Sequence, residues 1–158
     1  RGVSALTELE LLLVRKAART NYYTIKASKN IFLESIKDYL ISPVLKRVYT
    51  DGKIIFNVGI KSGYTALSQL TSVVDDSIQT YAVSRTTFKS IESNCRESSD
   101  MFSLNDKIVK IEVWRYDPMI FMVDNCVDRL SLYLSFAKDN DERTEESLEE
   151  LMKEINNG

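Results

Sequence analysis

The sequence predicts an α+β protein in two parts, a short N-terminal helix with a β-hairpin and a mixed α/β domain that ends in two helices. Three patterns lead to this prediction. Near the N-terminus, leucines at helical spacing precede an apolar run that ends in cations and a second run rich in aromatic and β-branched residues. In the middle, apolar and polar residues alternate as they do in half-buried strands. Toward the C-terminus, two segments return to helical spacing.

The first predicted element is a helix at residues 3–10. Ser4 is placed to cap it, and Leu6 and Leu9 lie three positions apart, on one side. A short amphipathic helix is therefore expected at the start of the chain.

A β-hairpin is predicted to follow this helix. Residues 12–16 form an apolar strand that ends in cations, residues 17–21 form a polar tip, and residues 22–26 form an aromatic and β-branched returning strand. The cations expected at the tip are Arg15, Lys16 and Arg19.

A helix followed by a strand, a basic tip and a second strand is the order in which a winged helix-turn-helix presents its recognition helix and wing to DNA. The predicted module spans residues 1–27. In this interpretation Ser4 and Thr7 face the major groove. Phosphate or minor-groove contacts come from the hairpin, at Arg15, Lys16, Arg19 and Asn21. The structural alternative is a helix that leads into a plain hairpin of a mixed domain.

This segment resembles the bacterial MarR-type winged-helix transcriptional regulators. The resemblance covers about 25 residues and lies in the runs Leu6-Thr7-Glu8-Leu9-Glu10 and Asn21-Tyr22-Tyr23-Thr24-Ile25. It implies that the chain begins inside the DNA-reading helix, so that residues 1–27 are the end of a DNA-binding module.

The charge differs between the two ends of the chain. Residues 1–53 hold ten Lys and Arg against five Asp and Glu, whereas residues 54–158 hold eleven against eighteen. A basic segment can neutralise phosphates, while an acidic domain favours protein or small-ligand partners. The alternative is that the basic surface is only solvated.

Residues 28–158 are predicted to form the α/β domain. A helix over residues 31–39, capped by Ser28, should end before Ser42 and Pro43. Residues 44–50 and 53–59 then form two strands around Asp51-Gly52, a favoured two-residue hairpin turn.

The remaining elements follow from periodicity and loop composition. They are a helix at residues 63–73, a strand at 79–83, a capped helical turn at 84–89, an exposed loop at 92–105, a strand at 107–116, and helices at 127–138 and 144–156.

This domain resembles C-terminal regions attached to winged-helix domains in bacterial regulator-like proteins, some akin to the antitoxins of abortive-infection systems. The matching runs are residues 62–68, 111–118 and 128–134. The resemblance implies an architecture and no reaction.

Several functional classes are disfavoured. The chain has no histidine, which Ser-His-Asp and Cys-His nucleophile systems and His-ligated zinc all require. It has no G-x-x-x-x-G-K-[ST] phosphate loop. Its two cysteines, Cys95 and Cys126, are expected to be reduced structural thiols.

Three groups of residues in the α/β domain carry two interpretations each. Glu112, Asp117, Asp124 and Asp128 are interpreted as dispersed acids in preference to a Mg²⁺ site. Trp114 is interpreted as a packed aromatic in preference to part of a ligand pocket with Arg115 to Asp117. The acidic last helix is expected to fold back on the domain through its apolar stripe, and contact with a partner is the alternative.

The sequence therefore predicts a DNA-binding transcriptional regulator or antitoxin-like protein whose partners are double-stranded DNA and, through the C-terminal domain, a protein. The resemblance also allows a homodimer. Neither an enzyme, a cofactor, a metal nor a membrane partner is expected, and the absence of a signal peptide or long apolar run favours the cytoplasm. The alternative is a protein-interaction or small-ligand-binding domain with no nucleic-acid role.

Overall fold

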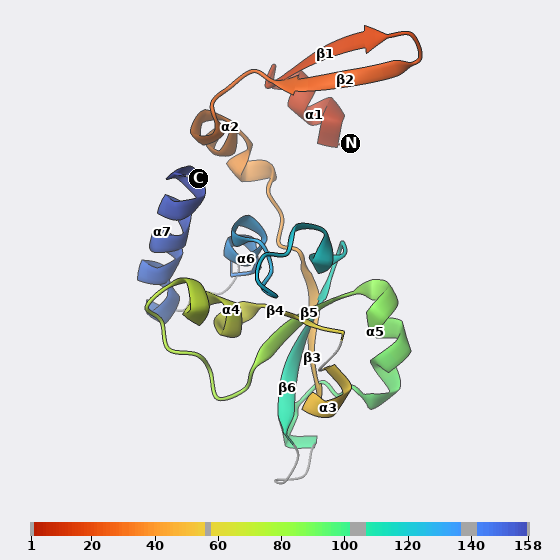
Figure 1. Cartoon of the computed structure of the whole chain (residues 1–158), viewed down its shortest axis with the longest axis vertical. Coiled ribbons are helices and arrows are strands. Elements are labelled where there is room, and N and C mark those ends of the chain that lie inside the picture. The colour runs from red at the N-terminus through yellow and green to blue at the C-terminus, as the bar shows by residue number, and fades with distance from the viewer. Residues whose placement is uncertain (1, 56–57, 102–106, 137–141, 158) are drawn as a thin grey trace. The chain divides into compact units, whose positions relative to one another are not determined.

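The computed structural model describes residues 2–55, 58–101, 107–136 and 142–157. The described chain is α+β, as predicted (Figure 1). It forms two compact units, residues 1–40 and residues 41–158.

The first unit holds the predicted helix and hairpin. Helix α1 (Gly2–Glu8) leads into strands β1 (Leu12–Ala17) and β2 (Thr20–Ile25), which pair antiparallel. The predicted third element is also confirmed, as α2 (Lys29–Ile36) with the 3-10 turn η1 (Lys37–Tyr39). Ser28 lies just before α2, where its carbonyl accepts the amide of Phe32.

The second unit is built on a four-stranded mixed sheet. Its strands are β3 (Val44–Asp51), β4 (Ile60–Lys61), β5 (Thr80–Ser84) and β6 (Ile108–Trp114), in the order β3-β6-β5-β4. Strand β6 pairs antiparallel with β3 and parallel with β5, and β5 pairs antiparallel with β4. The predictions of strands at residues 79–83 and 107–116 are confirmed.

The predicted hairpin around Asp51-Gly52 is wrong. Strand β3 runs through Asp51 and is followed by the short helix α3 (Gly52–Ile55), while its antiparallel partner is the distant β6. The Asp51 carboxylate accepts the amide of Lys53 and so starts a helical turn. Ile55 is buried, and a short buried apolar run has the same pattern in a helix as in a strand. Residues 56–57 of the predicted second strand lie outside the described residues.

One face of the sheet packs against α3 and α5 (Arg85–Ile91). The core on this face joins Phe88 and Ile91 of α5 and Ile55 of α3 to sheet residues. The sheet contributes Val48, Val83, Val109, Ile111 and Val113. Ser84 caps α5, since its side chain accepts the Thr87 amide, which confirms the capped turn predicted at residues 84–89.

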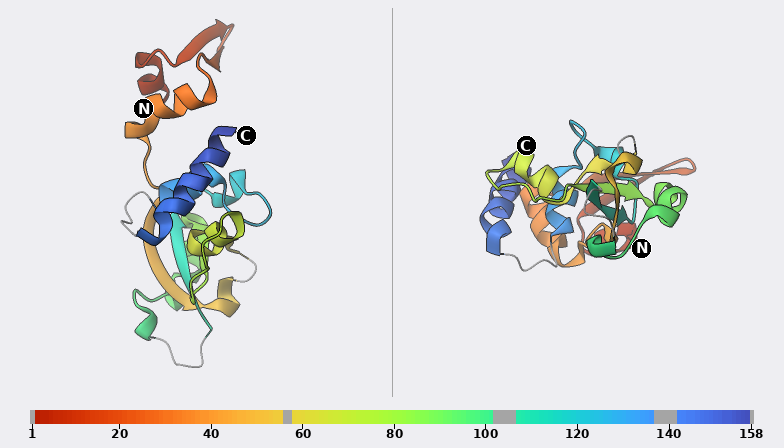
Figure 2. Two further views of the ribbon diagram at one scale, coloured as in Figure 1. Left: turned by 90° about the vertical axis from the view of Figure 1, so that its left-hand side faces the viewer. Right: turned by 90° about the horizontal axis from the view of Figure 1, so that it is seen from below.

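The opposite face is covered by α4 (Gly63–Leu70), α6 (Arg129–Ser135) and α7 (Glu142–Asn157), and α7 lies in front of the sheet in the left view of Figure 2. Helix α4 contacts β5 and α6, and α6 contacts α7. Leu151 and Ile155 of α7 are buried, so the expectation that the acidic helix folds back is confirmed. All three helices were predicted, with ends that differ by a few residues.

The connections are mostly short turns. The predicted loop at residues 92–105 contains the 3-10 turns η2 (Glu92–Asn94) and η3 (Ser99–Met101), and its residues 102–106 lie outside the described residues. After β6, η4 (Pro118–Phe121) is capped by the Asp117 carboxylate. Within the described parts of the chain, no helix is both long and apolar enough to cross a membrane.

Candidate nucleic-acid interface

Helix α1 ends in a compact cap that directs the chain into the hairpin. The Glu10 amide donates to the Thr7 carbonyl, and the Leu11 amide donates to the Leu6 carbonyl, each at 3.0 Å. Glu10 has φ 56°, so the pattern is a Schellman cap in which a glutamate occupies the position usually taken by glycine. Leu11, at 8% exposure, is the apolar residue of this cap.

Both polar residues expected to read bases lie within α1. The prediction that Ser4 caps the helix is wrong, because the helix includes Gly2 and Val3 ahead of it. The Thr7 hydroxyl donates to the Val3 carbonyl at 2.8 Å, one turn earlier. Ser4 and Thr7 are exposed, and three positions apart they share one side of the helix.

The hairpin has a tighter turn than the predicted tip at residues 17–21. Ala17 pairs with Thr20, which leaves only Ala18 and Arg19 in the turn. Ala18 has φ 53°, the backbone of a two-residue hairpin turn whose first position favours glycine. The strands therefore extend to the turn, and Arg19 lies at its end.

The register divides the predicted contact residues between two faces of the hairpin. Lys16 pairs with Asn21, and Val14 pairs with Tyr23, on one face. The Asn21 amide donates to the Tyr23 hydroxyl at 3.4 Å along this face. Arg15 lies on the other face, opposite Tyr22. The six predicted residues therefore do not form a single surface.

A groove of about 330 Å³ lies between α1 and the first of these faces. Its lining residues are Val3, Ser4, Thr7, Glu8, Val14 and Tyr23. The groove thus brings Ser4 and Thr7 beside the strand positions that continue to Lys16 and Asn21. Arg15 faces away from it.

The cations of the hairpin are available to a ligand. Arg15, Lys16 and Arg19 are exposed, and within the described part of the chain none of them forms an ion pair. A cation without a carboxylate partner keeps its attraction for phosphate. The acid Glu8 lines the groove, so the cationic character belongs to the hairpin and not to the helix.

Tyr22 and Tyr23 were not predicted as interface residues. They are 57% and 47% exposed, one on each face of the hairpin. Strand alternation places these neighbouring tyrosines on opposite faces, but it does not predict that both faces are exposed.

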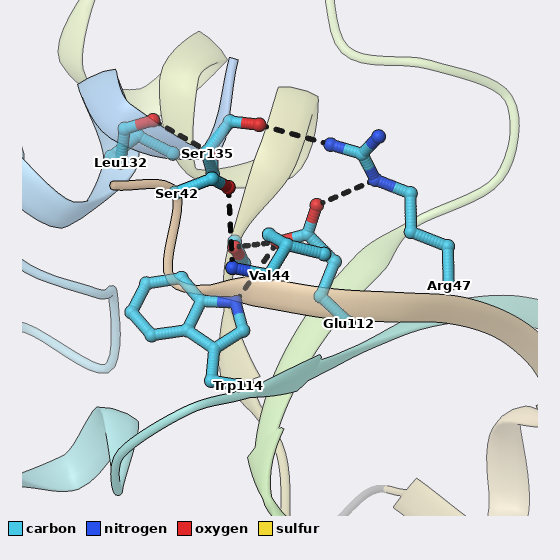
Figure 3. A network of polar contacts seen from close by, with 8 residues as sticks. Ser42, Val44, Arg47, Glu112, Trp114, Leu132 and Ser135 are labelled. Atoms are coloured by element: carbon cyan, nitrogen blue, oxygen red, sulfur yellow. Dashed lines mark hydrogen bonds and ion pairs between the residues drawn. The ribbon is translucent and has the colours of Figure 1, made fainter. Parts of the chain in front are cut away.

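In the second unit, the residues considered for a magnesium site or a ligand pocket have structural roles. The buried carboxylate of Glu112 accepts from Arg47 Nε at 3.0 Å, from Ser62 Oγ at 2.6 Å and from Trp114 Nε1 at 3.2 Å (Figure 3). Arg47 also donates to the Ser135 carbonyl at 3.0 Å. The cluster therefore joins the sheet to the start of α4 and the end of α6.

The other three acids that were considered as magnesium ligands lie at helix caps or in a turn. Asp117 caps η4, Asp128 caps α6, and Asp124 has a positive φ of 50° in a turn. Among the described residues, no group of three or more His, Cys, Asp or Glu side chains could hold a metal ion. Trp114 is fully buried and meets Tyr116 edge-on at 5.6 Å, in agreement with the packing interpretation.

Cys95 and Cys126 are free cysteines in poorly reactive surroundings. Burial raises the pKa of both thiols above its ordinary value, although nearby Lys61 opposes this effect at Cys126. The thiolate is the nucleophile, so a raised pKa lowers reactivity at neutral pH.

Comparison of the chain with protein-family models, with curated proteins and with solved structures found no match.

Proposed function

We propose that this chain binds double-stranded DNA as a transcriptional regulator or antitoxin-like protein, and that residues 1–27 are the recognition helix and wing of a winged helix-turn-helix. The observation that carries the proposal is the exposed hairpin beside α1, whose cations Arg15, Lys16 and Arg19 lack ion-pair partners among the described residues.

In this proposal the hairpin contacts the DNA backbone. Lys16 and Asn21 lie on the hairpin face that borders the groove, so they approach the DNA strand that α1 binds. Arg19 reaches beyond the turn to phosphate or the minor groove. Arg15 lies on the opposite face, away from the groove.

Helix α1 supplies the base contacts in the proposal. Ser4 and Thr7 carry hydroxyl groups that can both donate to and accept from base edges. The Thr7 hydroxyl already donates to Val3, so it is better placed to accept from a base than to donate to one. Ser4 is the more versatile of the two.

The α/β unit is assigned to sensing or partner binding, in the manner of MarR-type or abortive-infection regulators. Support for this part is the separation of residues 41–158 as a compact unit with its own core. A separate acidic domain can bind a partner without a structural change in the hairpin that contacts DNA.

The direct test measures binding of the full-length protein to a labelled duplex of its own promoter region by fluorescence anisotropy. We expect replacement of Arg15, Lys16 and Arg19 by alanine to weaken binding about tenfold or more. A matched control replaces the exposed cations Lys53, Lys107 and Lys153 of the second unit by alanine, with the same change in net charge. Equal affinities for the two triple variants would end the proposal.

A second candidate, protein interaction, is supported by an apolar loop after β6. Residues 119–123 are five consecutive large apolar side chains, each 44–63% exposed. The loop is held at both ends, by the Asp117 cap and by a tight turn in which Val123 and Cys126 exchange backbone hydrogen bonds. A firmly held, exposed apolar run is typical of an interaction surface.

The occupant we propose for this loop is a second copy of the chain. Residues 119–123 carry no charge, so the loops of two copies can pack against each other across a two-fold axis. Sedimentation of the full-length protein should show a dimer, and the Ile120→Ser/Phe121→Ser variant should shift it to monomer. A wild-type monomer at about 100 μM, a concentration above typical dissociation constants, would contradict the dimer.

A further inference from the structure

A second groove lies on the α5 side of the sheet, in the α/β unit. It has a volume of about 410 Å³, within the usual range of small-molecule sites, and it opens to solvent. Strand β3, strand β6 and helix α5 contribute its walls. Its lining residues are Leu45, Lys46, Arg85, Phe88, Lys89, Glu92 and Val113.

The floor of this groove is apolar. Phe88 and Val113 belong to the core and are only 5% and 3% exposed. Leu45 lies where the register of β3 shifts against β6, and it is partly exposed at the edge. Leu45, at 38% exposure, therefore carries most of the hydrocarbon that an apolar ligand would remove from water.

The rim of the groove is cationic. Arg85 and Lys89 are four residues apart on α5, so their side chains lie on one side of the helix above Phe88. Neither forms an ion pair within the described residues. Two uncompensated cations therefore border an apolar floor.

The other two charges of the rim largely compensate each other. Lys46 Nζ lies 3.5 Å from a Glu92 carboxylate oxygen and 3.9 Å from the centre of the Phe88 ring. The ammonium covers the ring face, so the floor left for a ligand is Leu45, Val113 and the ring edge. Glu92 repels an anion that approaches Lys46.

We propose that this groove binds a compact organic carboxylate, with its carboxylate at Arg85 and Lys89 and its apolar body on Leu45, Phe88 and Val113. An inorganic anion would leave Leu45 exposed, and a neutral apolar molecule would make no ion pair with Arg85 and Lys89. The combination selects a ligand that carries one anionic end and one apolar end.

The test is an NMR titration of the ¹⁵N-labelled full chain with octanoate and with 2-naphthoate, which separate a linear from an aromatic apolar body. Saturable shifts should centre on the amides of residues 45–46 and 85–92, with a dissociation constant of about 1 mM or lower for at least one carboxylate. Octylammonium and inorganic phosphate are the controls for charge and for the apolar body. Neither should reproduce these shifts.

Substitutions in the groove test which residues bind the carboxylate of the ligand and which bind its apolar body. Arg85→Gln/Lys89→Gln should weaken binding about fivefold, and Glu92→Gln should strengthen it about twofold because a repelling charge is removed. Leu45→Ser should weaken binding as well. Lys153→Gln, on α7, is the matched control and should leave affinity unchanged.

Three results would overturn the proposal. The first is the absence of saturable shifts with both carboxylates up to about 10 mM, the limit of useful affinity. The second is equal binding of octylammonium or phosphate. The third is unchanged affinity in the Arg85→Gln/Lys89→Gln variant. Binding is measured without DNA, so the result is independent of the proposed regulator function.

Discussion

At the scale of residues, Glu10 and Ala18 hold backbone conformations that side chains disfavour. Both have positive φ, 56° and 53°, at the two points where the chain turns sharply in the first unit. Glycine adopts such angles without a steric cost, whereas other residues lose about 1 kcal/mol or more. The helix cap and the hairpin turn therefore form despite their local sequence.

The first prediction concerns these two turns. Glu10→Gly and Ala18→Gly should each raise the free energy of unfolding of the first unit by about 0.5–1 kcal/mol, because strain is relieved. Urea denaturation followed by circular dichroism measures it. Glu8→Gly is the control, since Glu8 is helical and glycine there should destabilise. A loss of stability at Glu10 or Ala18 would show that these angles are not strained.

The second prediction concerns Arg47 and Glu112. Arg47→Met should lower the free energy of unfolding by about 2 kcal/mol, because Glu112 is left buried without its cation. This loss is smaller than the loss expected for a fully buried ion pair, because the Arg47 side chain is 38% exposed. The Arg47→Met/Glu112→Gln double variant should lose less than the sum of the single losses. Additive losses in urea denaturation would argue against coupling of the two side chains.

The third prediction concerns the thiols of Cys95 and Cys126. Burial raises their pKa values in the folded protein, so the unfolded state releases its thiol protons at lower pH than the folded state does. Stability that is constant at neutral pH should therefore fall as the pH rises above about 8.5. The Cys95→Ser/Cys126→Ala variant should show a smaller fall between pH 7 and pH 9.5 in urea titrations. An equal fall in both proteins would contradict this assignment.

At the scale of elements, periodicity predicted most helices and strands. The segment of β6 has apolar residues at alternate positions 109, 111 and 113, and the segment of α4 has apolar residues at helical spacing, so the first matches a strand pattern and the second a helix pattern. The segment after Asp51 was mispredicted because Asp51-Gly52 is a favoured turn dipeptide. Pairing of β3 with β6, more than fifty residues later, overrides that local preference.

The hairpin of the candidate interface was predictable as an element, but its turn and its register were not. An apolar run and an aromatic, β-branched run identified the two strands, and alternation alone places Arg15 and Lys16 on opposite faces. The residue of β2 that pairs with each cation depends on the length of the turn. A turn of Ala18 and Arg19 requires a positive φ at alanine, which sequence preferences disfavour. The pairing of Arg15 with Tyr22 and of Lys16 with Asn21 therefore became visible only with the register.

The fourth prediction concerns the start of α4. Gly63 has φ 53°, and a Cβ there would lie 2.9 Å from the Thr80 methyl carbon. Gly63→Ala should lower the free energy of unfolding by about 2 kcal/mol, because strain and a steric clash add together. Differential scanning calorimetry measures the loss. The control is Ser68→Ala, within the same helix, and a similar change in the two variants would contradict the steric explanation.

At the scale of the whole molecule, the charges have different roles in the two units. All three cations of the hairpin are exposed and unpaired within the described residues. The second unit has cations of both kinds, since Lys46, Arg47 and Arg129 form ion pairs and the exposed Arg85 and Lys89 form none among the described residues. The excess of acids in residues 54–158 lies partly on α7, which buries its apolar stripe against the unit. This distribution favours DNA contact by the first unit.

The fifth prediction, and the most direct test of DNA binding, is the salt dependence of duplex affinity in the full-length protein. The logarithm of the affinity should fall linearly with the logarithm of salt concentration, and the Arg15→Ala/Lys16→Ala/Arg19→Ala variant should have a slope shallower by about 2. The control triple variant at Lys53, Lys107 and Lys153 should keep the wild-type slope. An affinity that stays flat from about 50 to 200 mM salt, or an unchanged slope in the hairpin variant, would contradict the account.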